Sequence, residues 1–154
     1  MTLDVRAHGR ILNIHKPIGW TSNDVIRRLK PPRKAFKVGH AGTLDPFADG
    51  VLLVCLGRAT KQVPELMELE KEYVADIQLG LQTDTLDISG VVEKTAAVPK
   101  IGPVRLLSAI DRFTGEIVQT PPVFSALKVK GRRSHERARN GEAVTPEPRR
   151  ITIY

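Results

Sequence analysis

A carboxylate and an imidazole lie close together in one turn-rich segment of the sequence. Residues 39–50 are GHAGTLDPFADG, in which His40 precedes Asp45. The glycines and the proline fix an unusual backbone path, so the segment predicts a rigidly held Asp45 on a loop. An aspartate held in this way can attack an electrophilic carbon or exchange a proton with a substrate. The alternative from the residues alone is that Asp45 only caps a turn before Pro46.

The elements before this loop are predicted to be a strand, a turn and a helix. Apolar residues at 11–14 favour a strand, which ends in a proline- and glycine-containing turn at 16–19. Thr21 or Ser22 then offers an N-cap for a helix. Apolar residues recur at helical spacing until the two consecutive prolines at 31–32 stop that helix.

The elements around and after the loop follow from similar patterns. Residues 38–50 lack periodicity and predict a loop, whereas residues 51–56 are apolar on both faces, as is typical of a buried strand. The single cysteine, Cys55, lies in this run and predicts a small buried side chain rather than a disulfide partner or a metal ligand. Residues 57–69 predict a helix with a break at Pro64.

The second half of the sequence alternates between predicted strands and helices. A period of two from residue 73 to residue 79 predicts a strand with Tyr73, Ala75, Ile77 and Leu79 on one face. The further predicted elements are a long turn at 83–90, a strand near 91–92, a helix at 104–113, a strand at 116–119, a charged helix at 134–140 and a strand at 151–154. Hairpin-like neighbours also occur, so the sequence predicts an α+β fold with a mixed, largely antiparallel sheet and flanking helices.

Charge and composition narrow the class of protein. Lysine and arginine total 24 against 17 acidic residues, which gives a formal charge of +7. This excess fits a polyanionic partner such as nucleic acid, and the alternative is a merely solubilising surface. One cysteine fits a reducing compartment, and no stretch reaches the ~20 apolar residues of a membrane-spanning helix. Because the N-terminal residues also lack a signal-peptide pattern, we expect a cytoplasmic protein without membrane contact.

Four blocks of the sequence, in order, resemble the motifs of the TruB family of pseudouridine synthases. GHAGTLDPFADGVLLV is similar to the motif whose aspartate is catalytic in that family. LNIHKPIGWTS, KEYVADIQLGLQTDTLDISG and PPVFSALKVKGRRSHERARNGEAV are similar to the family's lysine-proline-glycine motif, its tyrosine motif and its proline-proline and serine-alanine-leucine-lysine block. The resemblance covers Gly9 to Tyr154, and a chance match to four ordered blocks is far rarer than a match to one.

The resemblance implies that a uridine of RNA is isomerised to pseudouridine, and it assigns the substrate as the uridine at position 55 in the T-stem loop of tRNA. The bond between ribose C1′ and uracil N1 breaks, the detached base turns, and it rejoins through C5. Asp45 would act either by covalent attack or by assisting formation of a glycal, and both routes remain open. Tyr73 matches a tyrosine that stacks on the base and is placed to remove the C5 proton. From the residues alone, Tyr73 would instead be a core side chain.

The resemblance also assigns supporting roles to His40 and Lys16. His40 matches the family histidine that packs against nucleotides displaced when the target base flips out of the RNA stack. No second histidine or cysteine lies at ligand spacing, so we reject a metal site, but a histidine satisfied within the turn stays possible as an alternative. Lys16 matches the lysine that supports the catalytic loop or a nearby phosphate, although His15 stands where an aspartate is usual. Elsewhere such a lysine would simply be exposed in a turn.

A basic run near the C-terminus is suited to phosphate contacts, which position RNA without reading its sequence. Its predicted RNA-binding residues are Lys128, Lys130, Arg132 and Arg133, with Arg137 and Arg139 following them.

Members of the family continue past this point, through an arginine motif that pairs with the catalytic aspartate and usually into a small RNA-binding domain. We therefore interpret residues 1–154 as the N-terminal part of the catalytic domain, with the arginine motif and the RNA-binding domain absent. The resemblance implies no metal and no organic cofactor, and we expect a monomer without an obligate protein partner. The alternatives are a catalytically inactive RNA-binding or tRNA-folding fragment and a protein-interaction module, which the lack of a large apolar stripe disfavours.

Overall fold

The computed structural model describes residues 5–31, 35–122, 128–129, 132–133, 140 and 146–154 of the chain. The chain divides into two units, Met1–Ala75 and Asp76–Tyr154, and each is described by itself. Antiparallel sheets and short helices occur in both units, which confirms the predicted α+β class. No helix within the described ranges is long and apolar enough to cross a membrane.

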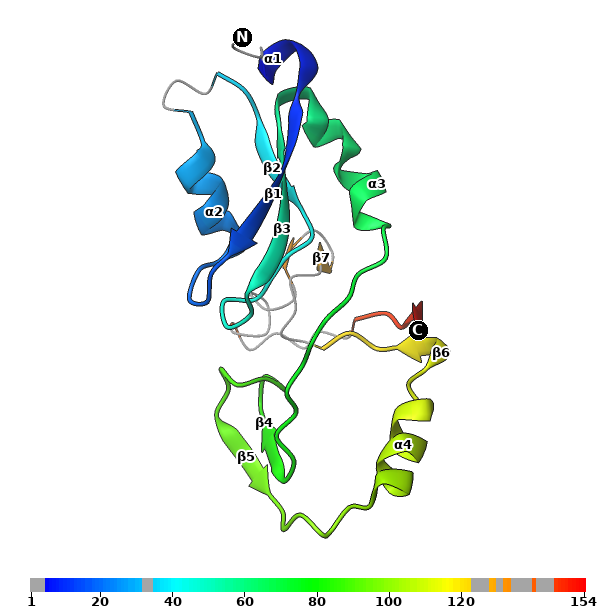
Figure 1. Cartoon of the computed structure of the whole chain (residues 1–154). Coiled ribbons are helices and arrows are strands. Elements are labelled where there is room, and N and C mark those ends of the chain that lie inside the picture. Colours follow the sequence, from blue (N-terminus) through cyan, green and yellow to red (C-terminus); the bar gives the residue numbers. More distant parts are fainter. Residues whose placement is uncertain (1–4, 32–34, 123–127, 130–131, 134–139, 141–145) are drawn as a thin grey trace. The chain divides into compact units, whose positions relative to one another are not determined.

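A three-stranded antiparallel sheet forms the centre of the first unit (Figure 1). Strand β3 (Gly50–Leu56) lies between β1 (Arg10–Lys16) and β2 (Val38–Ala41). The strands predicted at 11–14 and 51–56 are confirmed. The loop predicted from residue 38 onwards is wrong for β2, because pairing with β3 extends four residues that have no strand periodicity of their own.

Helix α2 (Ser22–Leu29) forms as predicted and begins with a capping box. The Thr21 hydroxyl accepts a hydrogen bond from the Asp24 backbone N–H, and the Asp24 carboxylate accepts one from the Thr21 backbone N–H at 2.8 Å. Thr21 is therefore the N-cap, and Ser22 is the first helical residue. These reciprocal contacts satisfy backbone donors that the first turn cannot pair internally.

The core of the first unit lies between α2 and the sheet. Val25 and Ile26 of α2 pack against alternate residues of β3, Leu52 and Val54, with Leu56 beside them. The alternation places these three β3 residues on one face of the strand. Cys55 points to the opposite face and is buried as a free thiol, which confirms its predicted role as a small core side chain.

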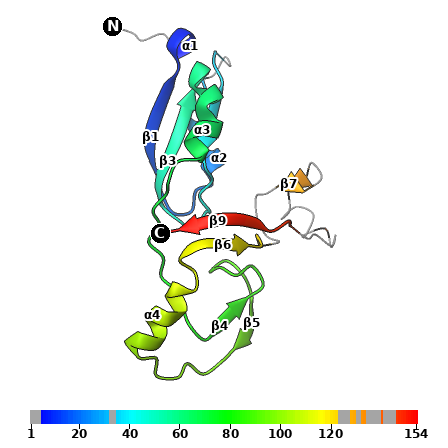
Figure 2. The same cartoon turned by 90° about the vertical axis from the view of Figure 1, so that its right-hand side faces the viewer.

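The other face of the sheet is covered by the segment that follows β3. A 3-10 helix, η1 (Gly57–Gln62), leads directly into α3 (Val63–Met67). Figures 1 and 2 together show α2 and α3 on opposite sides of the strands. Pro64 occupies the first turn of α3, so it begins this helix rather than breaking it. The short helix α1 (Val5–His8) packs on η1.

The strand predicted from residue 73 to residue 79 is wrong. This segment has no helix or strand structure, and Tyr73, Val74 and Ile77 are strongly exposed. Its period-two pattern is typical of a strand, but a strand forms only when a second strand pairs with its backbone. No described strand pairs with this segment, so it has the sequence pattern of a strand but does not form one.

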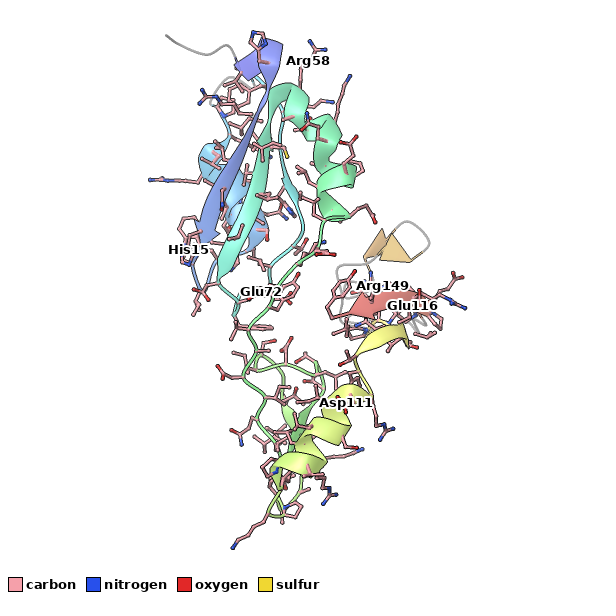
Figure 3. All side chains as sticks on the ribbon, turned by 45° about the vertical axis from the view of Figure 1, so that its right-hand side comes forward. His15, Arg58, Glu72, Asp111, Glu116 and Arg149 are labelled. Atoms are coloured by element: carbon pink, nitrogen blue, oxygen red, sulfur yellow. The ribbon has the colours of Figure 1, made fainter. Side chains whose placement is uncertain are left out.

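The second unit consists of hairpin-like pairs and one helix. Its described elements are β4 (Leu81–Thr83), β5 (Val92–Thr95), α4 (Pro103–Asp111), β6 (Gly115–Gln119), β7 (Lys128–Val129), β8 (Arg132–Arg133) and β9 (Arg149–Ile153). The pairs are β4 with β5, β6 with β9 and β7 with β8, all antiparallel. Figure 3 shows Glu116 and Arg149 on the paired strands β6 and β9. The predicted strands, turn and helix between 83 and 119 and the strand at 151–154 are confirmed, whereas the predicted helix at 134–140 lies outside the described residues apart from Asn140.

Candidate active site

The loop that carries Asp45 connects the end of β2 to the start of β3. Gly42 opens it with φ of +96°, a conformation that other residues rarely adopt. The Ala48 N–H then donates to the Asp45 carbonyl at 3.1 Å, which closes a turn around Pro46. Asp45 therefore lies on a turn whose two ends are fixed by neighbouring strands of one sheet. Its carboxylate is exposed, and no described residue hydrogen bonds to it or pairs with it.

The turn between β1 and α2 supports this loop through its backbone. The Gly19 N–H donates to the Pro46 carbonyl at 2.7 Å, immediately after Asp45 in the chain. This bond joins two segments that are far apart in the sequence. It fixes the carbonyl side of the loop without using any side chain.

Ser22 fixes the other side of the loop. Its hydroxyl accepts a hydrogen bond from the Leu44 N–H at 3.0 Å and donates one to the Leu44 carbonyl at 3.3 Å. Ser22 is only 3% exposed, so water does not readily replace these bonds. The sequence identified Ser22 only as a candidate N-cap. Its place in the LNIHKPIGWTS block was the available signal for a further role, although the contact with the loop itself leaves no local pattern.

Lys16 is fully buried, with 0% of its surface exposed. Its Nζ donates to the carbonyls of Pro17 at 3.0 Å and Trp20 at 2.7 Å. The alternative that Lys16 is an exposed turn lysine is therefore wrong. An ammonium group is held in this buried position because the turn aims two carbonyl oxygens at it. Lys16 thus fixes the turn whose Gly19 N–H contacts the Asp45 loop.

A side-chain contact joins the far end of the loop to β1. His15 Nε2 lies 3.2 Å from Asp49 Oδ2, and both side chains are largely exposed. The position of His15 at the end of β1 is visible in Figure 3. His15 lies near the end of β1, and Asp49 lies near the end of the loop. Their contact therefore attaches the loop to β1, in addition to its attachment to the turn at Gly19.

His40 lies on β2, where its backbone pairs with Val54 of β3. Its Nδ1–H donates to the Gly42 carbonyl, so the ring is satisfied within the turn, as one of the two interpretations proposed. This contact orients the ring and leaves Nε2 without a partner among the described residues.

Tyr73 lies in the irregular segment after α3 and is 69% exposed. The interpretation of Tyr73 as a core side chain is therefore wrong for this structure. No hydrogen bond joins its hydroxyl to a described residue, and none joins it to Asp45. The structure thus assembles Lys16, Ser22 and the Asp45 loop through hydrogen bonds, and no hydrogen bond joins Tyr73 to these described residues.

The predicted phosphate-binding residues fall in and around a short hairpin. Lys128 lies on β7, Arg132 and Arg133 lie on β8, and Lys130 lies outside the described residues. The hairpin belongs to the second unit, whereas Asp45 belongs to the first. Within the described ranges, no group of three or more His, Cys, Asp or Glu side chains could hold a metal ion.

These features define a class of site in which one exposed carboxylate is presented on a loop fixed by main-chain hydrogen bonds. Residues 27–154 match the TruB family pseudouridylate synthases, N-terminal domain. The chain belongs to this family.

Individual relatives carry more specific names. The chain is 49% identical over 144 residues to the tRNA pseudouridine synthase B of Clostridium kluyveri, covering 94% of this chain and 50% of that protein. It is 47% identical over 144 residues to the enzyme of the same name from Caldanaerobacter subterraneus subsp. tengcongensis, again covering 94% of this chain and 50% of the relative. It is 46% identical to that of Ralstonia pickettii, covering 96% of this chain and 46% of the relative. The chain thus spans about half the length of these relatives.

The fold also resembles a solved structure. A chain of a crystal structure of a Cbf5-Nop10-Gar1 complex superposes with a TM-score of 0.52 and 24% sequence identity. The match covers 92% of this chain and 32% of the other. At this identity the likeness concerns the fold alone, and it agrees with the α+β architecture described above.

Proposed function

We propose that this chain supplies the catalytic aspartate of an enzyme that isomerises the uridine at position 55, in the T-stem loop of tRNA, to pseudouridine. The observation that carries the proposal is the attachment of the Asp45 loop by backbone groups on both sides of the aspartate, at Leu44 and Pro46. The backbone that carries the carboxylate is thus held in place before a ribose binds. The names of the similar proteins support tRNA as the substrate, and the position within tRNA rests on the resemblance of the sequence motifs.

The reaction balances without a co-reactant. The bond between C1′ and N1 breaks, a bond between C1′ and C5 forms, the proton leaves C5, and N1 gains a proton. Asp45 can attack C1′ or assist removal of a ribose proton, and in both routes the carboxylate accepts and then releases a bond or a proton. We therefore propose that neither a metal nor an organic cofactor takes part.

We assign the supporting roles to the residues around Asp45 and to Tyr73. Tyr73 stacks on the detached uracil, which is worth ~1–3 kcal/mol for a base on an aromatic ring. Its exposure leaves the ring available for a base supplied by the RNA. His40 packs against nucleotides displaced by base flipping, through the ring edge that carries Nε2. Lys16 acts through the turn at 17–20 rather than on a phosphate, because its Nζ is buried against two carbonyls.

The RNA-binding surface is proposed to include the basic residues at 128–133. Lys128, Lys130, Arg132 and Arg133 would contact phosphates of the T-stem, which sets the register of the RNA without reading its bases. The net charge of +7 would favour this association at low salt. We propose that the protein acts as a monomer in the cytoplasm, where tRNA is modified.

One alternative has an observation in its favour. Asp45 and Tyr73 are both exposed, and no hydrogen bond joins these two described residues. This arrangement fits a chain that binds or helps to fold tRNA without carrying out the isomerisation.

Release of tritium from C5 of uracil tests the proposal, because the C5 proton is lost only when the base is rejoined through C5. The full chain is incubated with a T-arm RNA hairpin carrying tritium at C5 of the target uridine. We expect tritium release by the natural chain and none by Asp45→Asn, while the matched control Asp111→Asn, on the exposed helix α4, stays active. RNA binding without tritium release by the natural chain would remove the enzymatic function and support the alternative.

A further inference from the structure

A groove lies beside the catalytic loop, between the turn at 17–20 and the exposed side of α2. It is lined by Gly19, Trp20, Asp24, Arg27 and Arg28 and has a volume of about 500 Å³. Sites that bind small ligands have volumes of roughly 300–1,000 Å³, so one nucleotide fits such a groove. None of the five lining residues was assigned to RNA binding by the sequence patterns.

The charge of the groove is positive. Both carboxylate oxygens of Asp24 are used, because Oδ2 accepts hydrogen bonds from the Thr21 hydroxyl at 2.6 Å and from its backbone N–H at 2.8 Å, while Oδ1 contacts the Arg27 guanidinium. Arg27 and Asp24 therefore neutralise each other. Arg28 has no ion pair or hydrogen bond to any described residue. Among the described residues, nothing neutralises the Arg28 guanidinium, which can therefore bind an anion.

The aromatic wall of the groove is fixed by its backbone. The Trp20 carbonyl accepts a hydrogen bond from the buried Lys16 ammonium, and the Trp20 N–H donates to the Pro17 carbonyl at 3.4 Å. Trp20 is nevertheless 41% exposed, so part of this residue faces solvent on a turn whose backbone is held by hydrogen bonds. An exposed aromatic ring on a fixed backbone is a stacking platform that loses little freedom when a base binds.

The groove is joined to the catalytic loop. Gly19, which lines it, donates its N–H to the carbonyl of Pro46, the residue after Asp45. The groove therefore adjoins the loop that carries Asp45, and an RNA strand whose uridine reaches Asp45 would pass close to it.

We propose that this groove binds one nucleotide of the RNA strand next to the target uridine, with its base stacked on Trp20 and its phosphate on Arg28. The position next to the target rests on the proposed function. A single-stranded or flipped nucleotide is the fitting occupant, because it presents an aromatic face and a phosphate together. The arrangement reads no base edge, so it would accept any base.

Tryptophan fluorescence tests this proposal directly, because Trp20 is the single tryptophan of the chain. The full chain is titrated with a T-arm RNA hairpin, and fluorescence is recorded beside an independent binding measurement with labelled RNA. We expect saturable quenching of Trp20, which also occurs in Asp45→Asn. We expect Arg28→Gln to bind RNA about fivefold more weakly, with a shallower salt dependence, because one phosphate contact is lost. Lys61→Gln, on η1 and outside the groove, is the matched control and should bind as the natural chain does.

A second pair of variants separates stacking from folding. Trp20→Phe keeps an aromatic face and should bind labelled RNA nearly as well as the natural chain, whereas Trp20→Leu should lose about tenfold in affinity. Equal affinities of these two variants would overturn the proposal, as would RNA binding without quenching of Trp20. Equal quenching by an acidic peptide of the same charge would also overturn it, because the groove would then recognise charge alone. Quenching without tritium release would support the proposed groove and contradict the proposed function. Tritium release without quenching would support the proposed function and contradict the proposed groove.

Discussion

The Ser22 hydroxyl contacts both backbone polar groups of Leu44, accepting from its N–H at 3.0 Å and donating to its carbonyl at 3.3 Å. One buried hydroxyl thus pairs with both backbone polar groups of the residue before Asp45. Because Leu44 is covalently joined to Asp45, any shift at Ser22 passes to the carboxylate through a single residue.

Replacing Ser22 by alanine should destabilise the chain by about 1–3 kcal/mol, because the Leu44 N–H loses its buried partner. Tritium release should fall as well, since the loop is no longer fixed at Leu44. Urea denaturation and the tritium assay measure the two effects. Ser108→Ala, at an exposed position of α4, is the control and should change neither. A Ser22→Ala variant with unchanged stability and activity would show that the loop is held without this residue.

Lysines 16 and 71 make similar contacts in different surroundings. Each Nζ donates to two backbone carbonyls, but Lys16 is fully buried and Lys71 is exposed. We expect Lys16→Met to reduce the free energy of unfolding by about 1–3 kcal/mol and Lys71→Met by less than about 0.5 kcal/mol. Both values can be measured by urea denaturation followed by circular dichroism. Similar losses of unfolding free energy in both variants would mean that the burial of Lys16 does not add to the stability that its hydrogen bonds provide.

The sequence predicted those elements whose signals are local. An N-cap at Thr21 or Ser22, the apolar run of β3 and a helix stop before the prolines at 31–32 each follow from neighbouring residues. All three are found, with Thr21 as the cap. Strand β2 was missed because only its pairing with β3 makes it a strand. The segment from 73 to 79 shows the opposite case. Its period-two pattern predicted a strand, but no described strand pairs with it, and it forms none.

The site was predicted less completely than the fold. The sequence singled out Asp45 and its loop, but the residues that hold the loop depend on contacts between distant segments. Neither the burial of Lys16 nor the double contact of Ser22 leaves a local pattern. Residue types in a turn do not reveal which carbonyl oxygens converge on a lysine, so these roles are visible only in the three-dimensional structure.

Gly57 should not tolerate a side chain. Its φ is +60°, and a Cβ atom would lie 2.2 Å from the Val5 carbonyl oxygen. Gly57→Ala should therefore cost at least about 2 kcal/mol, because the left-handed backbone penalty adds to a clash with main chain. Gly39→Ala is the matched control, since its nearest contact would be Thr60 Cγ2 at 3.9 Å. Thermal denaturation distinguishes them, and a Gly57→Ala chain as stable as the control would contradict the packing of α1 on η1.

Asp24 should make the stability of the chain depend on acid pH. Hydrogen bonds from the Thr21 hydroxyl and backbone N–H, with the nearby Arg27 charge, lower the pKa of the Asp24 carboxyl below its ordinary value of 3.8. A lowered folded-state pKa adds stability that is fully present well above 3.8 and is lost as pH falls through the folded-state value. Acid titration followed by circular dichroism should show a shallower loss in Asp24→Asn. Asp111→Asn controls for the change of charge, and identical curves for the natural chain and Asp24→Asn would contradict the prediction.

The Asp45 loop is attached through the backbone N–H and C=O of Leu44 and the backbone C=O of Pro46, and no side chain of the loop takes part in these bonds. Thr43 and Phe47, on either side of these attachments, can therefore be replaced while the path of the loop is kept. A library randomised at these two positions would vary the surface that meets the nucleoside around an unmoved aspartate. Such a library offers a route to enzymes that accept altered nucleobases.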